Sequence, residues 1–411
     1  MSHMEAPTSC SCVRWRSLGS EQGGRGSTGQ GAFLQSRDID QEPIASMTSR
    51  ERTLLALDHR APDRIPIDFW ASAGLKRKIG ERLGLSSQAF LDRYDVDLRY
   101  IGGPRYIGPA LAEQVNARDG RALSTDVWGV ARVAVELDLG DAVEYYSELA
   151  ASPLQSASTV DDVTTYDHWP SPDWFDYSVI EGQCDAVRAQ GRAVAFMGDR
   201  MNRIAQLKPA MYLCGIDTIL MNMALVPDIA HAVFAKIREF YNAYLERILA
   251  AANGKIDIVV SGDDFGTQRG LFMAPEMWDA FLREGFRDYN ALVHTAGARV
   301  MHHTCGAVQP LIPRLIACGL DVLQSIQPEA DGMSARDLKA AFGAELCFQG
   351  GVSIQKTMPY GTPDDVREEV KALVQSMGRE GGYIFGTAHN IQADTPIGNV
   401  VALLEAYHEF G

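Results

Sequence analysis

The stretch ARVMHHTCGAVQPLIPRLIA, residues 298–317, joins a short apolar run to a helix-like segment. The run ends in His303-Thr304-Cys305-Gly306, and the helix-like segment Val308–Ala317 follows directly. A continuous apolar run is typical of a strand in a parallel sheet whose two faces are covered. The stretch therefore predicts a β-strand followed by an α-helix, the repeating unit of α/β folds.

The same unit recurs along most of the chain. Eight short runs predict strands, at Ile65–Phe69, Leu98–Ile101, Ala193–Met197, Ile256–Val260, Arg299–His303, Val322–Ile326, Leu346–Gln349 and Tyr383–Phe385. Amphipathic patterns predict helices between and after the later runs, at Ile229–Ala251, Pro275–His294, Val308–Ala317, Ala335–Phe342, Pro363–Met377 and Val400–Tyr407. Eight such units predict a single (β/α)8 TIM barrel of the α/β class over residues 47–411.

Two segments depart from this alternation. Residues 1–46 are rich in serine and glycine and lack a periodic apolar pattern, so we expect a disordered tail or extension. Within 102–191, the alternating stretch Trp128–Leu137, a turn at 138–141 and the run Ala142–Tyr146 predict a β-hairpin. We interpret this hairpin as an excursion inserted after the second strand, which would form part of a roof over the active site.

Charge and composition limit the possible partners. The net charge of −15 disfavours nucleic acid and anionic membrane surfaces. No apolar run reaches the ~18 residues that a membrane span needs, and no signal peptide is apparent. Seven cysteines at irregular spacing are typical of a reducing compartment, so we expect a cytoplasmic protein with free thiols.

His303 and Cys305 are the first candidate metal ligands. Residues two apart on a strand point to the same face, so the imidazole and the thiol lie side by side at the end of this strand. His302 should point to the opposite face. Imidazole and thiolate are both zinc ligands. The alternative is a buried thiol next to a histidine that binds the backbone, since free cysteine is often buried.

Polar residues follow almost every predicted strand. In a TIM barrel the catalytic groups lie at the carboxyl ends of several strands. We expect Asp263 and Asp264 to be catalytic. The candidate substrate-binding residues are Asp68, Asp97, Asp199, Arg200, Gln327, Gln349 and Asn390. Asp68 and Asp97 have an alternative role as caps of the following helices.

The chain resembles the uroporphyrinogen decarboxylase superfamily from about Met47 to Gly411. The resemblance is carried by Arg50-Glu51-Arg52, Pro62-Asp63-Arg64-Ile65-Pro66, Ser261-Gly262-Asp263-Asp264 leading to Met273-Ala274-Pro275, His303-Thr304-Cys305-Gly306, Gln349-Gly350-Gly351 and the closing run from Gly386 to Pro396. It implies one of two chemistries. These are metal-free decarboxylation of a tetrapyrrole and zinc-dependent methyl transfer between a corrinoid and a thiol.

The segment after the first predicted strand separates the two branches. True decarboxylases carry Arg-Gln-Ala-Gly-Arg there, and the arginines hold substrate carboxylates. This chain has Ala71-Ser72-Ala73-Gly74-Leu75 instead, without either arginine. The resemblance is therefore closer to the zinc-dependent methyltransferases, which share the His-x-Cys pattern of His303 and Cys305.

The resemblance also implies a third zinc ligand after the last strand. The methyltransferases have a cysteine there, whereas this chain has His389 within Ala-His-Asn-Ile-Gln. We predict that His303, Cys305 and His389 bind Zn²⁺, with Asp263 or Asp264 as a fourth or displaceable ligand. No Asp-x-His-x-x-Gly run is present, so a corrinoid would arrive only as a substrate on a partner protein.

The expected function is methyl (alkyl) transfer to a zinc-activated thiol, with the methyl group supplied by that corrinoid. Two alternatives stay open. One is decarboxylation of a tetrapyrrole or a small acid. The other is a non-catalytic relative that binds a small ligand.

Overall fold

The computed structural model describes residues 47–111, 113–115, 122–197 and 205–411. Residues 1–46 and the predicted substrate-binding pair Asp199 and Arg200 lie outside this range. Met47–Gly411 form one compact unit. No helix in the described part of the chain is both long and apolar enough to cross a lipid bilayer.

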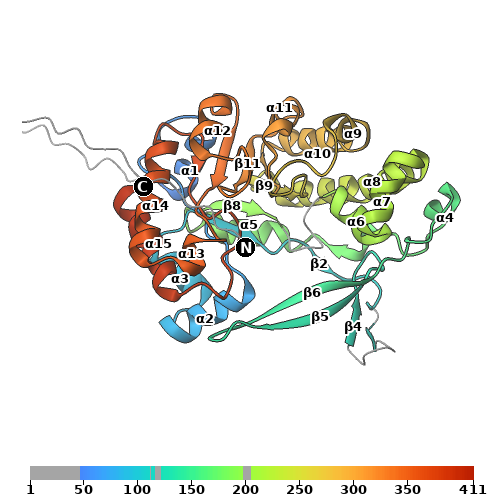
Figure 1. Cartoon of the computed structure of the whole chain (residues 1–411), viewed down its shortest axis with the longest axis horizontal. Helices are drawn as coiled ribbons and strands as arrows, with labels where there is room; N and C mark the ends of the chain where they lie inside the picture. The colour runs from blue at the N-terminus through green and yellow to red at the C-terminus, as the bar shows by residue number, and fades with distance from the viewer. Residues whose placement is uncertain (1–46, 112, 116–121, 198–204) are drawn as a thin grey trace, which may run out of the picture. The chain divides into compact units, whose positions relative to one another are not determined.

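A curled parallel sheet of seven strands forms the centre of the fold (Figure 1). Its strands are β1 (Leu98–Ile101), β8 (Ala193–Phe196), β9 (Ile258–Gly262), β10 (Arg299–His303), β11 (Val322–Ile326), β12 (Cys347–Gly350) and β13 (Tyr383–Ile384), in this spatial order. All neighbouring pairs are parallel. The carboxyl ends therefore meet at one rim, as in TIM-barrel-like folds.

The first predicted strand, Ile65–Phe69, does not form a continuous strand in the structure. It is an extended segment in which Ile67 forms an isolated parallel bridge with Phe385. The amide of Asp68 donates to the Phe385 carbonyl at 2.9 Å, and the amide of Asp97 donates to the Ile67 carbonyl at 3.0 Å. Pro66 explains the broken ladder, because proline has no N–H to donate.

Helices follow the strands and pack against the sheet (Figure 1). They are α1 (Ser49–Leu57), α2 (Ala73–Leu83), α3 (Ser87–Arg93), α4 (Val160–Thr164), α5 (Ile180–Arg188), α6 (Leu207–Cys214), α7 (Ile216–Leu225), α8 (Pro227–Ala252), α9 (Pro275–Phe281), α10 (Arg283–Thr295), α11 (Ile312–Ala317), α12 (Ala335–Phe342), α13 (Thr357–Tyr360), α14 (Pro363–Met377) and α15 (Ile397–Phe410), with short 3₁₀ turns at Pro172–Trp174 and Gln309–Leu311. The predicted helix Pro275–His294 is divided into α9 and α10 at Leu282.

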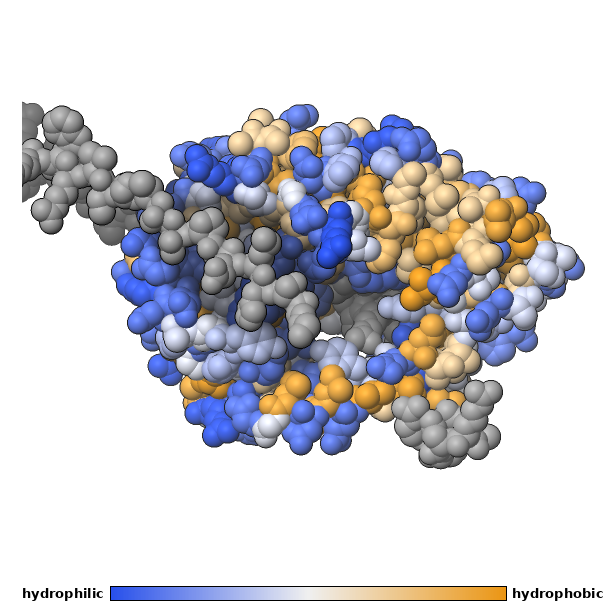
Figure 2. All heavy atoms as spheres, in the orientation of Figure 1, coloured by the Kyte–Doolittle hydropathy of each residue, from blue (hydrophilic) through white to orange (hydrophobic). Residues whose placement is uncertain are grey.

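Local sequence signals explain where these helices begin and which face is buried. Thr362 and Asp365 form a capping box at the start of α14, and Pro363 occupies its first turn. The buried residues of α14 recur at helical spacing, at Val366, Val370, Leu373, Val374 and Met377. This apolar stripe holds the helix against its neighbours. By contrast, α7 leaves several apolar side chains exposed, and Figure 2 shows apolar residues gathered over this side of the molecule.

A second, antiparallel sheet lies between β1 and β8 in the chain. Its strands are β3 (Glu113–Val115), β4 (Ala122–Thr125), β5 (Ala131–Asp138) and β6 (Val143–Ala151). β5 and β6 are joined by a tight turn in which Gly140 has a φ of +85°. A separate pair joins β2 (Arg105–Tyr106) to β7 (Phe175–Asp176). Between β4 and β5, the Trp128 ring packs edge-on against Phe240 of α8, with centroids 5.1 Å apart.

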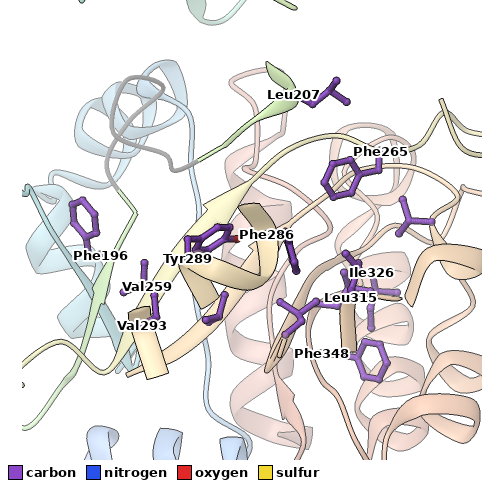
Figure 3. Packing of buried hydrophobic residues seen from close by; sticks show 14 of the residues in the cluster. Phe196, Leu207, Val259, Phe265, Phe286, Tyr289, Val293, Leu315, Ile326 and Phe348 are labelled. Carbon is purple, nitrogen blue, oxygen red and sulfur yellow. The ribbon is translucent and has the colours of Figure 1, made fainter. Parts of the chain in front are cut away.

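The strands bury both of their faces. Figure 3 shows Phe196, Val259, Phe286 and Tyr289 in the apolar layer between sheet and helices. The opposite faces of the strands form a second cluster, to which β10 contributes Met301. Because side chains alternate along a strand, His303 shares the inner face with Met301, and His302 faces the helical layer. His302 there stacks on Phe265 at 5.3 Å.

Candidate metal and substrate site

Three side chains that could bind a metal converge at the carboxyl rim of the sheet. His303 ends β10, Cys305 follows two residues later, and His389 lies in the loop after β13. Their ligand atoms all lie within 4.8 Å of one another. Sγ of Cys305 is 3.4 Å from Nε2 of His303. Tetrahedral zinc with ordinary bond lengths would separate a sulfur and a nitrogen ligand by about 3.5 Å. The donor set and its spacing therefore fit zinc.

Gln324 fixes the orientation of the His303 ring. Gln324 is the register partner of His303 on β11, and its Oε1 lies 2.5 Å from Nδ1 of His303. An amide oxygen only accepts, so Nδ1 carries the proton and donates it. The lone pair of Nε2 then points toward Cys305. Metal-binding histidines commonly have such a partner on their second nitrogen.

Asp264 is the acid that contacts this group. Its Oδ1 accepts a hydrogen bond from the Cys305 amide at 3.1 Å and lies 3.8 Å from Nε2 of His303. Its Oδ2 forms an ion pair with Nζ of Lys208 at 2.8 Å. Burial alone would raise the pKa of Asp264, but the Lys208 ammonium holds that pKa well below its usual range. Asp264 is therefore an ionised group beside the three ligands.

Asp263, the neighbouring acid, has a different role from the catalytic one that we predicted. Its carboxylate accepts backbone N–H bonds from Gln206, Leu207 and Lys208, at 2.7, 2.9 and 2.7 Å. These are the first donors of α6, so the side chain caps that helix. Burial raises the pKa of Asp263 to about 6, against these hydrogen bonds. Because both oxygens are occupied by the helix, we assign Asp263 a structural role.

Asp97 lies at the wrong end of the sheet for the substrate-binding role that we predicted. It precedes β1, at the amino ends of the strands, whereas the three candidate ligands lie at the carboxyl rim. Its fully buried carboxylate pairs with Arg52 at 2.6 Å and with Arg64 at 2.7 Å. It also accepts the Ile67 amide at 2.8 Å. Asp97 therefore holds the first segment of the chain against β1.

Asp68 and Gln349 do not line the adjacent cavity, and they support its wall through hydrogen bonds. Oδ2 of Asp68 accepts a hydrogen bond from the Tyr100 hydroxyl at 2.6 Å and a longer one from Nε2 of Gln349 at 3.4 Å. Tyr100 in turn accepts from the indole N–H of Trp70 at 2.7 Å. Burial raises the pKa of Asp68 to about 6, although the Tyr100 hydrogen bond opposes the shift. This series of hydrogen bonds fixes two rings, Trp70 and Tyr100, that line the adjacent cavity.

Gln327 fixes the loop that carries Cys305. Its Oε1 accepts the Gly306 amide at 2.9 Å. Gly306 has a φ of +90°, and a Cβ at this position would lie 2.4 Å from the Gly266 backbone. Only glycine fits such a close backbone approach. Gln327 and Gly306 therefore help to position the Cys305 thiol, and substrate binding by Gln327 stays a prediction.

A cavity of about 590 Å³ adjoins this group through His389. His389 and Asn390 line it, so Asn390 is the one predicted substrate-binding residue among those described that reaches the cavity wall. The other lining side chains are mostly aromatic or basic: Phe69, Trp70, Tyr100, Trp128, Tyr146, Tyr212 and Tyr241, with Lys76, Arg132 and Lys208. None of these lining residues was predicted from the sequence to belong to the site.

One signal could have revealed part of this wall. Trp128, Val130 and Arg132 all line the cavity, and they are two residues apart. The alternation that predicted the hairpin therefore also predicts one face with an aromatic, an aliphatic and a basic side chain. No comparable signal identifies Lys208 or Tyr212, which approach the cavity from α6.

Comparison with known proteins identifies the family of the chain. The model of the uroporphyrinogen decarboxylase (URO-D) family matches residues 204–410, which is half of the chain. The chain belongs to the uroporphyrinogen decarboxylase family. The matched part includes all three candidate ligands, His303, Cys305 and His389.

Individual relatives are distant. Uroporphyrinogen decarboxylase from Vibrio campbellii is 35% identical over 74 residues, which cover 18% of this chain and 20% of the relative. The enzyme from Mannheimia succiniciproducens is 21% identical over 188 residues, which cover 45% of this chain and 49% of the relative. The matches thus span from a fifth to half of these relatives' lengths.

A solved structure shows the same fold over a longer range. A methyltransferase from Methanosarcina mazei superimposes with a TM-score of 0.61, covering 89% of this chain and 99% of that protein. The sequence identity is 16%, so this likeness concerns the fold.

Proposed function

We propose that this protein is a zinc-dependent methyltransferase of the uroporphyrinogen decarboxylase family. It would transfer a methyl (alkyl) group to a thiol, and the group would come from a corrinoid carried by a separate protein. The observation that carries the proposal is the convergence of His303, Cys305 and His389, whose ligand atoms lie within 4.8 Å of one another.

His303, Cys305 and His389 would hold the zinc ion. With one thiolate and two neutral imidazoles the bound zinc would retain a formal charge of about +1, which lowers the pKa of a thiol placed on it. Gln324 orients His303 from behind, and Gln327 fixes the loop of Cys305 through Gly306. The protein thus supplies three donors and the hydrogen bonds that position two of them.

Asp264 and Lys208 form the charged edge of the site. The ion pair with Lys208 makes Asp264 a weak base, because the ammonium stabilises the carboxylate. We therefore assign Asp264 a positioning role. It accepts the Cys305 amide and holds Lys208 at the cavity wall.

The cavity disfavours the decarboxylase alternative. A tetrapyrrole with eight carboxylates needs several cations to hold it. The described lining offers three basic side chains, and two of them are already paired, Arg132 with Asp126 and Lys208 with Asp264. The site is therefore poorly matched to such a polyanion.

The test combines metal analysis with turnover. The purified full-length protein is expected to bind close to one zinc per chain. With methylcobalamin as the methyl donor, we expect loss of the methylated corrinoid spectrum and a thioether product with one of coenzyme M, homocysteine or glutathione. A parallel incubation with uroporphyrinogen measures released carbon dioxide.

Two results would overturn the proposal. One is a protein that stays metal-free after growth with zinc and also fails to take up added zinc. The other is zinc-independent release of carbon dioxide from uroporphyrinogen without any thioether, which would favour the decarboxylase alternative.

A further inference from the structure

The wall of the cavity is unusually rich in aromatic side chains. Seven of its lining residues are aromatic, and they come from the segment after Ile67, from β1, β6, α6 and α8, and from the turn before β5: Phe69, Trp70, Tyr100, Trp128, Tyr146, Tyr212 and Tyr241. Rings contributed by so many separate segments enclose a volume, whereas a single hydrophobic stripe would only cover a surface.

Hydrogen bonds and ring packing hold these aromatic groups in place. The Trp70 indole donates to Tyr100, which donates to the buried Asp68. Trp128 packs against Tyr241 with ring centroids 5.4 Å apart. Rings that are fixed before a ligand arrives lose little conformational entropy on binding, so they favour a rigid planar ligand.

The aromatic wall begins next to the candidate metal ligands. Trp70 lines the cavity, and its ring centroid is 5.9 Å from that of His303. His389 also lines the cavity and lies 5.0 Å from His303 by the same measure. A ring bound in the cavity would therefore present a substituent to the metal group.

The charged side chains that line the cavity favour one sign of ligand charge. Among the described lining residues, three are basic and one, Asp126, is acidic. Asp126 is neutralised by Arg132 at 3.0 Å, and the Arg132 guanidinium lies over the Tyr212 ring at 4.4 Å. Lys208 is paired with Asp264. Within the described residues, no carboxylate lies within ion-pair distance of the remaining cation, the exposed Lys76, so this unpaired positive charge favours an anionic ligand.

We propose that the small-molecule substrate of this site, the methyl acceptor, is a one-ring aromatic acid that carries the reacting thiol as a substituent. Its ring would lie among Trp70, Trp128, Tyr146 and Tyr212, and its acidic group would pair with Lys76. The volume of about 590 Å³ suits a ligand of this size, since binding cavities for small molecules commonly measure about 300–1,000 Å³. The assignment of this ligand as the substrate rests on the proposed methyl transfer, whereas the binding itself does not require the metal.

Binding of three simple probes tests the ring and the charge separately. Benzoate, cyclohexanecarboxylate and benzylammonium are titrated into the full-length protein, metal-free and zinc-loaded, and followed by calorimetry or by saturation-transfer NMR. We expect benzoate to bind at least tenfold more tightly than either other probe in both forms. Equal binding of benzoate and cyclohexanecarboxylate, or tighter binding of benzylammonium, would overturn the proposal.

Matched variants locate the probe. Tyr146→Leu is expected to weaken benzoate binding about fivefold or more, because base-like stacking on one aromatic ring is worth about 1–3 kcal/mol. Tyr145→Leu on the same strand is the control, since Tyr145 is 55% exposed and does not line this cavity. Lys76→Gln should weaken benzoate but leave neutral phenol unchanged, and Arg82→Gln on the same helix should change neither. If both tyrosine variants behave alike, benzoate binds elsewhere and the proposal fails.

The outcome also separates this inference from the proposed function. Zinc binding and thioether formation without any preference for the aromatic probe would refute only the substrate class. Selective benzoate binding by a protein that never takes up zinc would refute the methyltransferase and leave the aromatic site standing.

Discussion

The hydrogen bond between Gln324 and His303 gives the sharpest test of the metal site. Gln324→Leu removes the acceptor for Nδ1–H of His303 and conserves most of the side-chain volume. The lost bond is short, at 2.5 Å, and both side chains are fully buried. Loss of such a partner typically costs about 10–100-fold in metal affinity, or about 1.4–2.7 kcal/mol. We expect a fall in zinc affinity of this size.

Gln349→Leu is the matched control. Gln349 is the register partner of Gln324 on β12, so both variants change a buried glutamine in the same layer. Gln349 donates to Asp68, and no hydrogen bond links it to a candidate ligand. Its zinc affinity should stay within about twofold of the wild type, because the partners of His303 are unchanged.

Gln324→Glu adds a rescue. A carboxylate accepts the Nδ1–H bond more strongly than an amide does. Nε2 of Gln324 has no hydrogen-bond partner among the described residues, so replacing this amide nitrogen by a carboxylate oxygen removes no hydrogen bond. Zinc affinity should return to at least the wild-type value. All three variants are measured by competition with a chelating dye, with melting temperature as a check on folding. Wild-type affinity in a folded Gln324→Leu protein, or equal losses in both leucine variants, would refute the orienting role.

Three further substitutions test the assignments around the sheet. Cys305→Ser should abolish most zinc binding, because a neutral hydroxyl poorly replaces a thiolate; zinc content should be unchanged in the control Cys347→Ser, whose thiol is buried at the start of β12. Asp263→Asn should lower the free energy of unfolding by about 1–3 kcal/mol, since an amide group cannot accept all three helix donors; urea unfolding measures the change, and an unaltered midpoint would contradict the capping role. Asp97→Asn should destabilise by about 3–5 kcal/mol by leaving Arg52 and Arg64 incompletely paired; a smaller loss than in Asp263→Asn would show that this ion-pair network contributes little.

The periodic parts of the fold could be predicted from the sequence. Seven of the eight predicted strands are present, because continuous apolar runs such as Ala193–Phe196 bury both faces. The Ile65–Phe69 segment shows the limit of this reasoning. Its composition is that of a strand, but Pro66 interrupts the hydrogen-bond ladder. Hydrophobicity predicts that a segment is buried, but it does not predict whether each residue has the backbone N–H that a strand ladder needs.

The residues of the candidate site also divide into those that could be placed from the sequence and those that could not. His303 and Cys305 could be placed together because they are two apart on one strand, and His389 followed from the family resemblance. Asp263 and Asp264 could not be told apart, since both follow the same strand and neither carries a signal for its partner. Asp97 could have been excluded, because it precedes the predicted strand Leu98–Ile101 and so belongs to the amino end of a parallel sheet. The order of an acid and its strand is therefore readable from the sequence, whereas the contacts of neighbouring acids are not.

The cavity wall depends on contacts that no local pattern contains. Lys208 and Tyr212 reach it from α6, and Tyr241 reaches it from α8. Their positions depend on how these helices pack, which is set by long-range contacts and leaves no signal at fixed spacing. Trp128 is the exception, because it begins an alternating run whose one face lines the cavity.

Asp263 and Asp264 together explain how the fold couples the three candidate ligands to the cavity. Asp263 holds the first turn of α6 through its backbone amides, including that of Lys208. Asp264 holds the side chain of the same lysine and also the amide of Cys305. One helix, and with it the wall residues Lys208 and Tyr212, is thus tied to the loop that carries a candidate ligand. The two adjacent aspartates after β9 thus have separate roles: Asp263 fixes the backbone of the helix, and Asp264 joins the charge of Lys208 to the loop of the candidate ligand Cys305. A change in either acid should therefore alter the cavity and the ligand group together.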